Sequence, residues 1–368
     1  MTTGTLMRAE DARGPGELRG SPALAAFLDR LGLGELTGRD TATPLGSNQS
    51  VTGTTSSGAK VFVKQLDRQK PDAPQRWARI VGFDEFAAVR PVPDLWTPRL
   101  LGADEQELLV AFEWLDDAVT GDSLATDDEF TDDLAYRTGR AIGGLHTTSA
   151  DAAPRPLDTS PPMLPPVTFL DAIPLATYVL SSGAMLDVWR LLQNDADLRA
   201  ALTGLRRRES TVPAVPAHCD LRLDQLLWQE NRLYVCDWEE FRLADPARDV
   251  GSFAGEWLYR AVLGIPEASA EREQLSHQDI LDRGVSELAR LRGRNVAFWA
   301  GYREAVGQVG SEVAARATAF AGWHLIDRMI ASAEQQPSLD TMNRAAAGIG
   351  RTAVLRPEKF ARTIGLEG

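Results

Sequence analysis

Two stretches of this 368-residue sequence carry the most information about its fold: HCDLRLDQ (218–225) and CDW (236–238). The segment that joins them, 225–236, contains two short apolar runs around a Glu-Asn-Arg turn, a pattern that predicts a small β-hairpin. Two acids, Asp220 and Asp237, are therefore expected at the ends of one hairpin, with an amide-bearing side chain between them in the sequence. Two acids in such an ordered set form a candidate catalytic constellation.

Phosphoryl transfer requires a set of this kind. One carboxylate accepts the proton of the attacking hydroxyl, and another, together with an amide oxygen, holds Mg²⁺ against the phosphates. The protein performs little covalent chemistry, so positioning and charge neutralisation account for the rate. On this interpretation Asp220 is the catalytic base and Asp237 is a magnesium ligand.

The hydrophobic pattern of the sequence changes near residue 115. Before it, the stretch 43–66 is rich in Thr, Ser, Gly and Val and predicts two strands joined by a turn, and 108–115 predicts a buried strand. Helices are expected at 21–36 and 75–90. After residue 115 helical patterns dominate, apart from a proline-rich loop and the hairpin. The sequence thus predicts an α+β fold with a β-rich N-terminal lobe and a mostly helical C-terminal lobe.

Composition excludes several classes of protein. A net charge of −13 gives little counterion release on nucleic acid, so we expect no nucleic-acid partner. No apolar run is long enough to span a bilayer, and the first twenty residues lack the apolar core of a signal peptide, so we expect no membrane association. Two cysteines suit a reducing compartment, and we expect a cytoplasmic protein.

A family resemblance rests on the ordered motif His218-x-Asp220-(x)4-Gln225 followed by Asp237-Trp238, and on the downstream segment ADPARDV (244–250). These residues resemble the motifs of the aminoglycoside phosphotransferase and choline kinase superfamily, a branch of the protein-kinase-like fold. The resemblance implies an ATP- and Mg²⁺-dependent kinase that phosphorylates a hydroxyl. Within this motif, we interpret His218 and Asp249 as structural supports of the loop.

The same resemblance assigns domains. It implies a nucleotide-binding lobe at 21–115 with a hinge near 112–116, and a helical lobe at 116–368 that carries the catalytic loop 218–225. Residues 1–20 are polar, Gly-rich and without periodicity, and this composition predicts a mobile arm. Kinase-like proteins place a phosphate-binding lysine on the third strand, where this sequence has Lys64 at the end of an apolar run.

The same resemblance implies further contacts with the nucleotide. The expected partner of the strand lysine is a helical glutamate about twenty residues later, which is Glu85 here. The segment containing Glu113 and Leu115 resembles the hinge whose backbone binds adenine. The phosphate loop lacks GxGxxG, and its place is taken by Gly46, Ser47 and Asn48.

A second departure from the family pattern concerns the metal. The family asparagine is Gln225 here, which offers the same amide oxygen one methylene further out. Its neighbour Asp224 could take the role instead, so either residue could complete the magnesium site with Asp237.

Arg222 narrows the resemblance. It lies two residues after Asp220, where a fixed guanidinium would stabilise charge on the transferring phosphate. HCDLRLDQ and the stretch 238–257 also resemble the kinase subunit of class V lanthipeptide and thioamitide biosynthesis. That resemblance implies phosphorylation of Ser or Thr in a ribosomal precursor peptide, after which a separate lyase or cyclase partner removes the phosphate to give dehydroamino acids.

Two other functions remain open at this stage. The acceptor could be a small molecule, such as an aminoglycoside or other antibiotic, an amino alcohol or a sugar. The unusual Gln225 and the degenerate phosphate loop are also compatible with a pseudokinase that binds a nucleotide or partner without turnover. Acceptor loops diverge within such folds, so the sequence does not choose between these acceptors.

Overall fold

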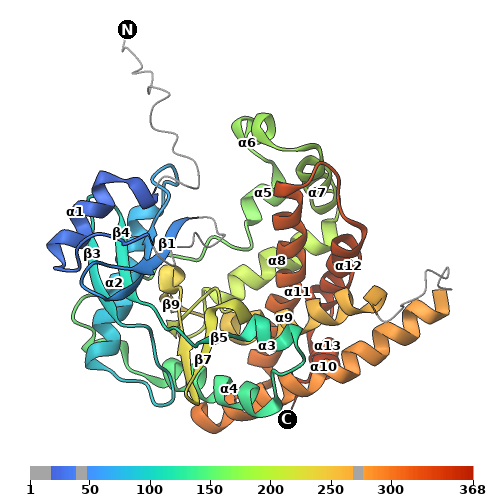
Figure 1. Ribbon diagram of the computed structural model, residues 1–368. Helices are drawn as coiled ribbons and strands as arrows, with labels where there is room; N and C mark the ends of the chain where they lie inside the picture. The colour runs from blue at the N-terminus through green and yellow to red at the C-terminus, as the bar shows by residue number, and fades with distance from the viewer. Residues whose placement is uncertain (1–17, 39–47, 268–276, 368) are drawn as a thin grey trace. The chain divides into compact units, whose positions relative to one another are not determined.

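The structure, a computed structural model, describes residues 18–38, 48–267 and 277–367 (Figure 1). Its chain divides into two compact units. The first comprises residues 1–86, 97–118 and 236–239, and the second comprises 87–96, 119–235 and 240–368. The expected division near residue 115 therefore differs in two places: 87–96 belongs to the second unit, and Cys236–Glu239 belongs to the first. The predicted mobile arm at 1–20 lies mostly outside the described residues.

A four-stranded antiparallel sheet with strand order β1-β2-β4-β3 forms the centre of the first unit. Its elements are η1 (Leu18–Gly20), α1 (Pro22–Arg30), β1 (Gln49–Thr54), β2 (Lys60–Gln65), α2 (Ala73–Val89, whose last turn belongs to the second unit), β3 (Leu100–Asp104) and β4 (Leu109–Glu113). The predicted hairpin at 43–66 is confirmed as β1 and β2, and the apolar run at 108–115 as β4.

Alternation along β2 explains how this sheet is covered. Val61 and Val63 are fully buried and pack with Phe27 of α1, whereas Phe62 is paired with Phe112 of β4, which packs against a second cluster on the other face. Side chains at successive strand positions point to opposite faces, so β2 is covered on both sides. Lys64 therefore lies in a strand with little access to water, at 9% exposure.

Helices dominate the second unit (Figure 1). They are α3 (Gly121–Thr126), α4 (Asp132–Thr147), η2 (Ala150–Ala152), α5 (Val167–Asp171), α6 (Leu175–Leu180), α7 (Gly183–Gln193), α8 (Ala196–Glu209), α9 (Ala247–Glu267), α10 (His277–Val306), α11 (Ser311–Gln335), α12 (Thr341–Leu355) and α13 (Pro357–Ile364). Two small sheets accompany them, formed by β5 (Val119–Thr120), β7 (Leu226–Gln229) and β8 (Arg232–Val235), and by β6 (Val215–Ala217) and β9 (Arg242–Ala244). Short 3₁₀ turns η3 (Leu223–Gln225) and η4 (Trp238–Glu240) flank the β7–β8 hairpin that the sequence predicts.

The long helices α4 and α10 pack closely because glycine removes side chains at their crossing. A Cβ at Gly139 would collide with the backbone oxygen of Phe298, and a Cβ at Gly301 with that of Tyr136. Phe253 of α9 stacks on Phe298 with ring centroids 4.1 Å apart. This packing gives α9 a fixed support, and α9 carries Asp249 near its first turn.

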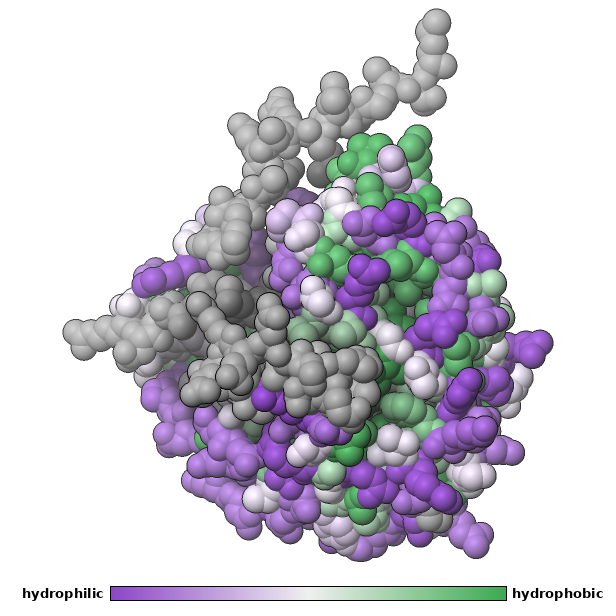
Figure 2. Space-filling model, turned by 90° about the vertical axis from the view of Figure 1, so that its right-hand side faces the viewer, coloured by the Kyte–Doolittle hydropathy of each residue, from purple (hydrophilic) through white to green (hydrophobic). Residues whose placement is uncertain are grey.

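The short helix α6 contrasts with this core. None of its residues is buried, and Leu175, Val179 and Leu180 are each at least 70% exposed. Figure 2 shows the resulting apolar patch at the top of the molecule. Isolated helices of this length are not stable in water, so α6 depends on its chain neighbours for its conformation.

The predicted α+β kinase-like fold class is confirmed, with a β-sheet in the N-terminal region and helices in the C-terminal region. Among the described residues, no helix has the length and apolar character needed to cross a bilayer.

Candidate active site

The loop that carries Asp220 is fixed from beneath by Asp249. The carboxylate of Asp249, which is fully buried, accepts hydrogen bonds from the backbone N–H groups of His218 at 2.8 Å and Cys219 at 2.7 Å. Cys219 has a φ of +68°, a left-handed conformation that is strained for a side chain of this kind. The two hydrogen bonds to Asp249 hold the backbone in this conformation immediately before Asp220.

Asp249 is held in turn by α4. His146 Nε2 lies 3.0 Å from its carboxylate, and His146 Nδ1 lies 3.0 Å from the hydroxyl of Tyr302. Burial alone would raise the pKa of Asp249, but its hydrogen bond to His146, the nearby charges and the backbone N–H of His218 lower the pKa overall. Burial raises the pKa of the Cys219 thiol, so this cysteine is unsuited to a role as a thiolate. The structure thus shows His218 and Asp249 in one buried bracing network.

The carboxylate of Asp220 is held by a hydrogen bond and is partly open to solvent. Its side chain is 42% exposed, and its carboxylate accepts a hydrogen bond from Gln225 Nε2 at 3.2 Å. The other end of the same amide, Gln225 Oε1, accepts a hydrogen bond from the backbone N–H of Arg222 at 3.0 Å. A carboxylate oriented by a buried amide and still open to solvent has the geometry of a general base.

This geometry changes the interpretation of Gln225. The sequence suggested that its amide oxygen completes a magnesium site, but that oxygen accepts from the loop backbone and the side chain is 2% exposed. Gln225 therefore acts as a brace between the two ends of the catalytic loop. The longer side chain reaches back across the η3 turn, which closes over three residues.

Arg222, whose side chain is 27% exposed, forms an ion pair with Asp224 beside Asp220. Arg222 Nε lies 3.3 Å from the carboxylate of Asp224 and 3.9 Å from that of Asp220. Burial raises the pKa of Asp224, although Arg222 opposes the shift. The guanidinium is thus already close to the expected base.

A charged group on α9 and α11 escaped the sequence analysis. Glu256 lies 2.7 Å from His324 Nε2, and although burial alone would raise its pKa, His324 and nearby arginines lower the pKa of Glu256 to about 2. Burial raises the pKa of Asp327, whose electrostatic neighbours include Asp220 and Arg222. The apolar residues of 321–328 are buried in the core, and the charged residues of HLIDR were the only sequence signal that ionisable groups lie among them.

In the first unit, Lys64 is the centre of a buried ion-pair network. Its Nζ lies 2.5 Å from Asp237 Oδ1 and 2.6 Å from Glu239 Oε2. Burial alone would lower the pKa of Lys64, but the two carboxylates outweigh it and raise the pKa above its usual range. Lys64 therefore stays protonated, as a residue that binds phosphate must. The structure brings Lys64 and Asp237 together, 173 residues apart in the chain.

The predicted partner of Lys64 was wrong. Both ion pairs of Lys64 go to Asp237 and Glu239 rather than to Glu85 of α2. Asp84 and Glu85 instead lie side by side on α2, where burial and then the charge of Glu85 raise the pKa of Asp84. Sequence spacing pointed to α2 because the lysine partner in kinase-like proteins is a helical glutamate. Glu239 directly follows Asp237-Trp238 in the sequence, and this position was the available indication that it could be the partner of Lys64.

The remaining nucleotide residues are partly described. Asn48 donates from Nδ2 to Glu239 at 3.0 Å and accepts from the backbone N–H of Asp67 at 3.2 Å. Gly46 and Ser47 lie outside the described residues. At the end of β4, the backbone N–H groups of Glu113 and Trp114 already donate to other backbone oxygens. Leu115 follows directly, as the next backbone group of the expected hinge.

The donor set fits magnesium in character. Asp237 supplies hard carboxylate oxygens and its side chain is 28% exposed. Within the described ranges, no group of three His, Cys, Asp or Glu side chains gathers to hold a metal. Mg²⁺ is commonly bound by one or two carboxylates together with substrate phosphates and water, so a sparse protein site is consistent with it.

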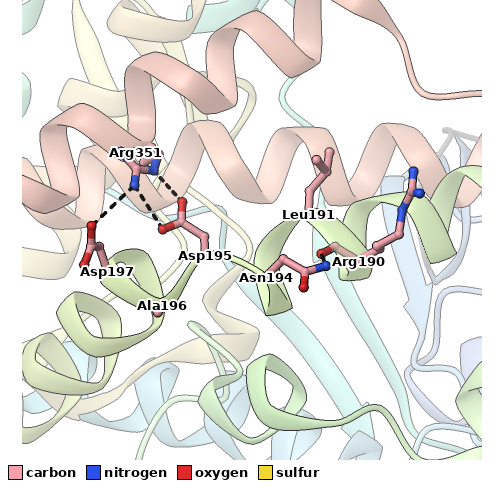
Figure 3. Close-up of a pocket in the computed structure, with 7 residues that line it drawn as sticks. All are labelled: Arg190, Leu191, Asn194, Asp195, Ala196, Asp197 and Arg351. Carbon is pink, nitrogen blue, oxygen red and sulfur yellow. Dashed lines mark hydrogen bonds and ion pairs between the residues drawn. The ribbon is translucent and has the colours of Figure 1, made fainter.

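A pocket of about 580 Å³ lies elsewhere in the second unit, between α7, α8 and α12 (Figure 3). Arg351 projects from α12 to Asp195 and Asp197 and closes one end of this pocket (Figure 3). None of the candidate site residues lines it. We therefore do not assign the pocket to the phosphotransfer chemistry.

The β-sheet of the first unit and the helices of the second define a kinase-like fold. Residues 42–293, more than half of the chain, match the phosphotransferase enzyme family abbreviated APH, and the chain belongs to that family. No curated protein matches the sequence.

Solved structures agree with this fold. A choline/ethanolamine kinase family protein from Mesorhizobium loti is 18% identical, with a TM-score of 0.51 over 96% of this chain and 97% of that chain. The choline kinase LicA from Streptococcus pneumoniae is 15% identical, with a TM-score of 0.52 over 91% and 99%. Spectinomycin phosphotransferase APH(9)-Ia, solved with ADP and spectinomycin, is 12% identical, with a TM-score of 0.51 over 92% and 98%.

Proposed function

We propose that this protein transfers the γ-phosphate of ATP, in the presence of Mg²⁺, to a hydroxyl group of an acceptor. The observation that carries the proposal is the braced position of Asp220, whose carboxylate is oriented by Gln225, preceded by backbone pinned to Asp249 and still 42% exposed. Asp220 accepts the proton of the attacking hydroxyl as the new P–O bond forms and the bond to ADP breaks.

In this proposal the first unit binds the nucleotide. Lys64, held protonated by its two carboxylates, binds the phosphates, and Asp237 holds Mg²⁺ through its partly exposed carboxylate. Mg²⁺ neutralises phosphate charge when bound. Adenine binds at the end of β4, through the backbone of Glu113 and Leu115.

The acceptor that we favour is a Ser or Thr of a precursor peptide, phosphorylated before a partner lyase or cyclase eliminates the phosphate. Arg222 supports this choice. Its guanidinium lies 3.9 Å from Asp220 and remains charged at any working pH. A peptide hydroxyl brings no charge of its own, so the enzyme must neutralise the transferring phosphate.

A second candidate is a small cationic molecule that carries a hydroxyl. The observation in its favour is the acid around Arg222: the exposed Asp224 and the largely buried Glu256 and Asp327 all interact electrostatically with this arginine. Negative charge at this place would attract an amine group beside the reacting hydroxyl. The two candidates therefore differ in the charge of the acceptor. A peptide hydroxyl is uncharged and depends on Arg222, whereas a cationic molecule is attracted by the acids near Asp220.

The test is phosphate transfer to two acceptor panels under the same conditions. One panel contains Ser/Thr peptides, including any precursor peptide encoded near this protein's gene, and the other contains aminoglycosides and amino alcohols. Mass spectrometry would detect one added phosphate as a gain of about 80 Da. Modified peptide and unmodified small molecules support the favoured acceptor, and the reverse supports the second. ATP binding without transfer to either panel would indicate a pseudokinase.

A further inference from the structure

The carboxylate of Glu239 has two cationic partners and one amide partner, and the proposed reaction assigns it no role. Its side chain is 9% exposed, yet it accepts from Lys64 Nζ at 2.6 Å, from Asn48 Nδ2 at 3.0 Å and from Arg76 Nη1 at 2.7 Å. The two oxygens divide this work: Oε2 faces Lys64 and Asn48, and Oε1 faces Arg76. A buried carboxylate is stable only when it is paired in this way.

The segment that carries Glu239 is also tied to α2. The indole of Trp238 stacks on Phe83 with ring centroids 3.4 Å apart and an 8° angle between the rings. Arg79 of α2 donates to the backbone oxygen of Glu239 at 3.4 Å, and Asp72 holds the other side of Arg76 at 2.8 Å. The carboxylate of Glu239 is thus fixed in space by α2, although it does not belong to that helix.

Asp237 and Glu239 compete for the same ammonium group but differ in exposure. The Asp237 side chain is 28% exposed, whereas that of Glu239 is 9% exposed and surrounded by donors. A carboxylate that turns to Mg²⁺ gives up much of its interaction with a neighbouring cation. Lys64 then needs a second anion to hold it, and Glu239 is within hydrogen-bond distance.

We propose that Glu239 is the positioning residue of the nucleotide site: with Arg76 behind it, Glu239 holds Lys64 so that Asp237 is released to bind the metal. The chain Arg76–Glu239–Lys64 replaces a direct pair between Lys64 and a glutamate of α2. In this arrangement α2 contributes a cation, and the anion comes from the segment after β8. The inference rests on the proposed function, because it assigns Lys64 to phosphate and Asp237 to Mg²⁺.

The experiment measures binding of ADP to the full chain by calorimetry over a range of Mg²⁺ concentrations. Glu239→Gln removes the charge and keeps the shape, so Lys64 remains paired with Asp237 and Mg²⁺ must displace it. We expect the Mg²⁺ concentration at half-maximal binding to rise about tenfold, the scale of one charge-assisted hydrogen bond. Adenosine affinity should stay unchanged, and Glu239→Asp should recover part of the loss. The control is Glu107→Gln, an exposed acid paired with Arg68 in the same unit.

A second background separates positioning from a general structural role. In Lys64→Met there is no ammonium to hold, so adding Glu239→Gln should leave the Mg²⁺ midpoint where Lys64→Met alone puts it. Equal shifts in both backgrounds, no shift in the wild-type background, or a larger shift from Glu85→Gln than from Glu239→Gln would overturn the inference. Those outcomes leave the proposed function standing if the wild-type chain binds ADP with Mg²⁺. Failure of the wild-type chain to bind it would contradict the proposed function and the inference together.

Discussion

Gln225 donates a hydrogen bond from its side-chain amide to the carboxylate of Asp220 over 3.2 Å, and its amide oxygen accepts from the backbone of Arg222. The catalytic loop therefore contains its own orienting group. An amide that forms hydrogen bonds at both ends braces the loop.

The first prediction concerns this brace. Gln225→Ala should lower turnover about 10- to 100-fold, because Asp220 loses its orienting donor while the base itself remains. The Mg²⁺ concentration that gives half-maximal nucleotide binding should not change. Calorimetry with ADP and Mg²⁺ beside a turnover assay checks both points. A raised Mg²⁺ requirement in the variant would restore Gln225 as a metal ligand.

The second prediction concerns Asp249. Asp249→Ala leaves the backbone N–H groups of His218 and Cys219 and the ring of His146 without their buried acceptor. Each such group costs about 1–3 kcal/mol, so we expect several kcal/mol less stability in denaturant unfolding. The variant should unfold at a clearly lower denaturant concentration, whereas the exposed control Asp187→Ala should not.

Asp249 also gives a pH dependence whose sign follows from its lowered pKa. The unfolded chain binds the proton on this carboxyl at higher pH than the folded chain does, since an unfolded Asp titrates near about 3.9. The stabilisation is therefore present above that pH and is lost as the pH falls through the folded pKa. Asp249→Asn should reduce the loss of unfolding free energy at acid pH. The same dependence of the unfolding free energy on acid pH in the variant and the wild type would contradict the assignment.

The third prediction compares lysines. Lys64→Met should weaken binding of ADP but not of adenosine, because Lys64 is assigned to the phosphates. Lys60→Met is a matched control: Lys60 belongs to the same strand, but its ion pair with Asp116 is about half exposed. Surface pairs of this kind contribute little, so Lys60→Met should be nearly silent. Equal losses from both changes would make Lys64 an ordinary surface charge.

The fourth prediction distinguishes the acceptors through Arg222. Arg222→His should lower peptide phosphorylation by roughly 10- to 10³-fold, the scale of one transition-state donor, with little change in nucleotide affinity. The measurement is kcat with the best peptide of the panel, beside the dissociation constant for ATP. A loss confined to nucleotide affinity would mean that Arg222 binds the nucleotide in the ground state and does not specifically stabilise the transition state.

The local motifs of this chain were predictable, and the long-range pairs were less so. HCDLRLDQ and the hairpin after it are encoded in consecutive residues, so the Asp220 loop and strands β7 and β8 followed from the sequence. The partner of Lys64 depends on how the segment after β8 packs on α2, through Phe83 and Trp238, and no local pattern determines that contact.

The charged residues of α11 were missed for a related physical reason. His324 lies within an apolar helical stretch, and its contact with Glu256 comes from the packing of α9 against α11. Helical periodicity indicates which face is buried but not which charged groups meet there. The hydrogen bonds of Gln225 were not predictable from the sequence, because they depend on the three-residue turn that its side chain spans.

The central claim is that Asp220 is the base of an ATP-dependent transfer to a hydroxyl. The most direct measurement is transfer of labelled γ-phosphate from ATP to the best acceptor of the two panels, by the wild type and by Asp220→Asn, with Mg²⁺ present. The account predicts labelled acceptor with the wild type and a loss of at least about 10²-fold in the variant, with nucleotide binding and thermal unfolding unchanged. Equal transfer by the two proteins would contradict it.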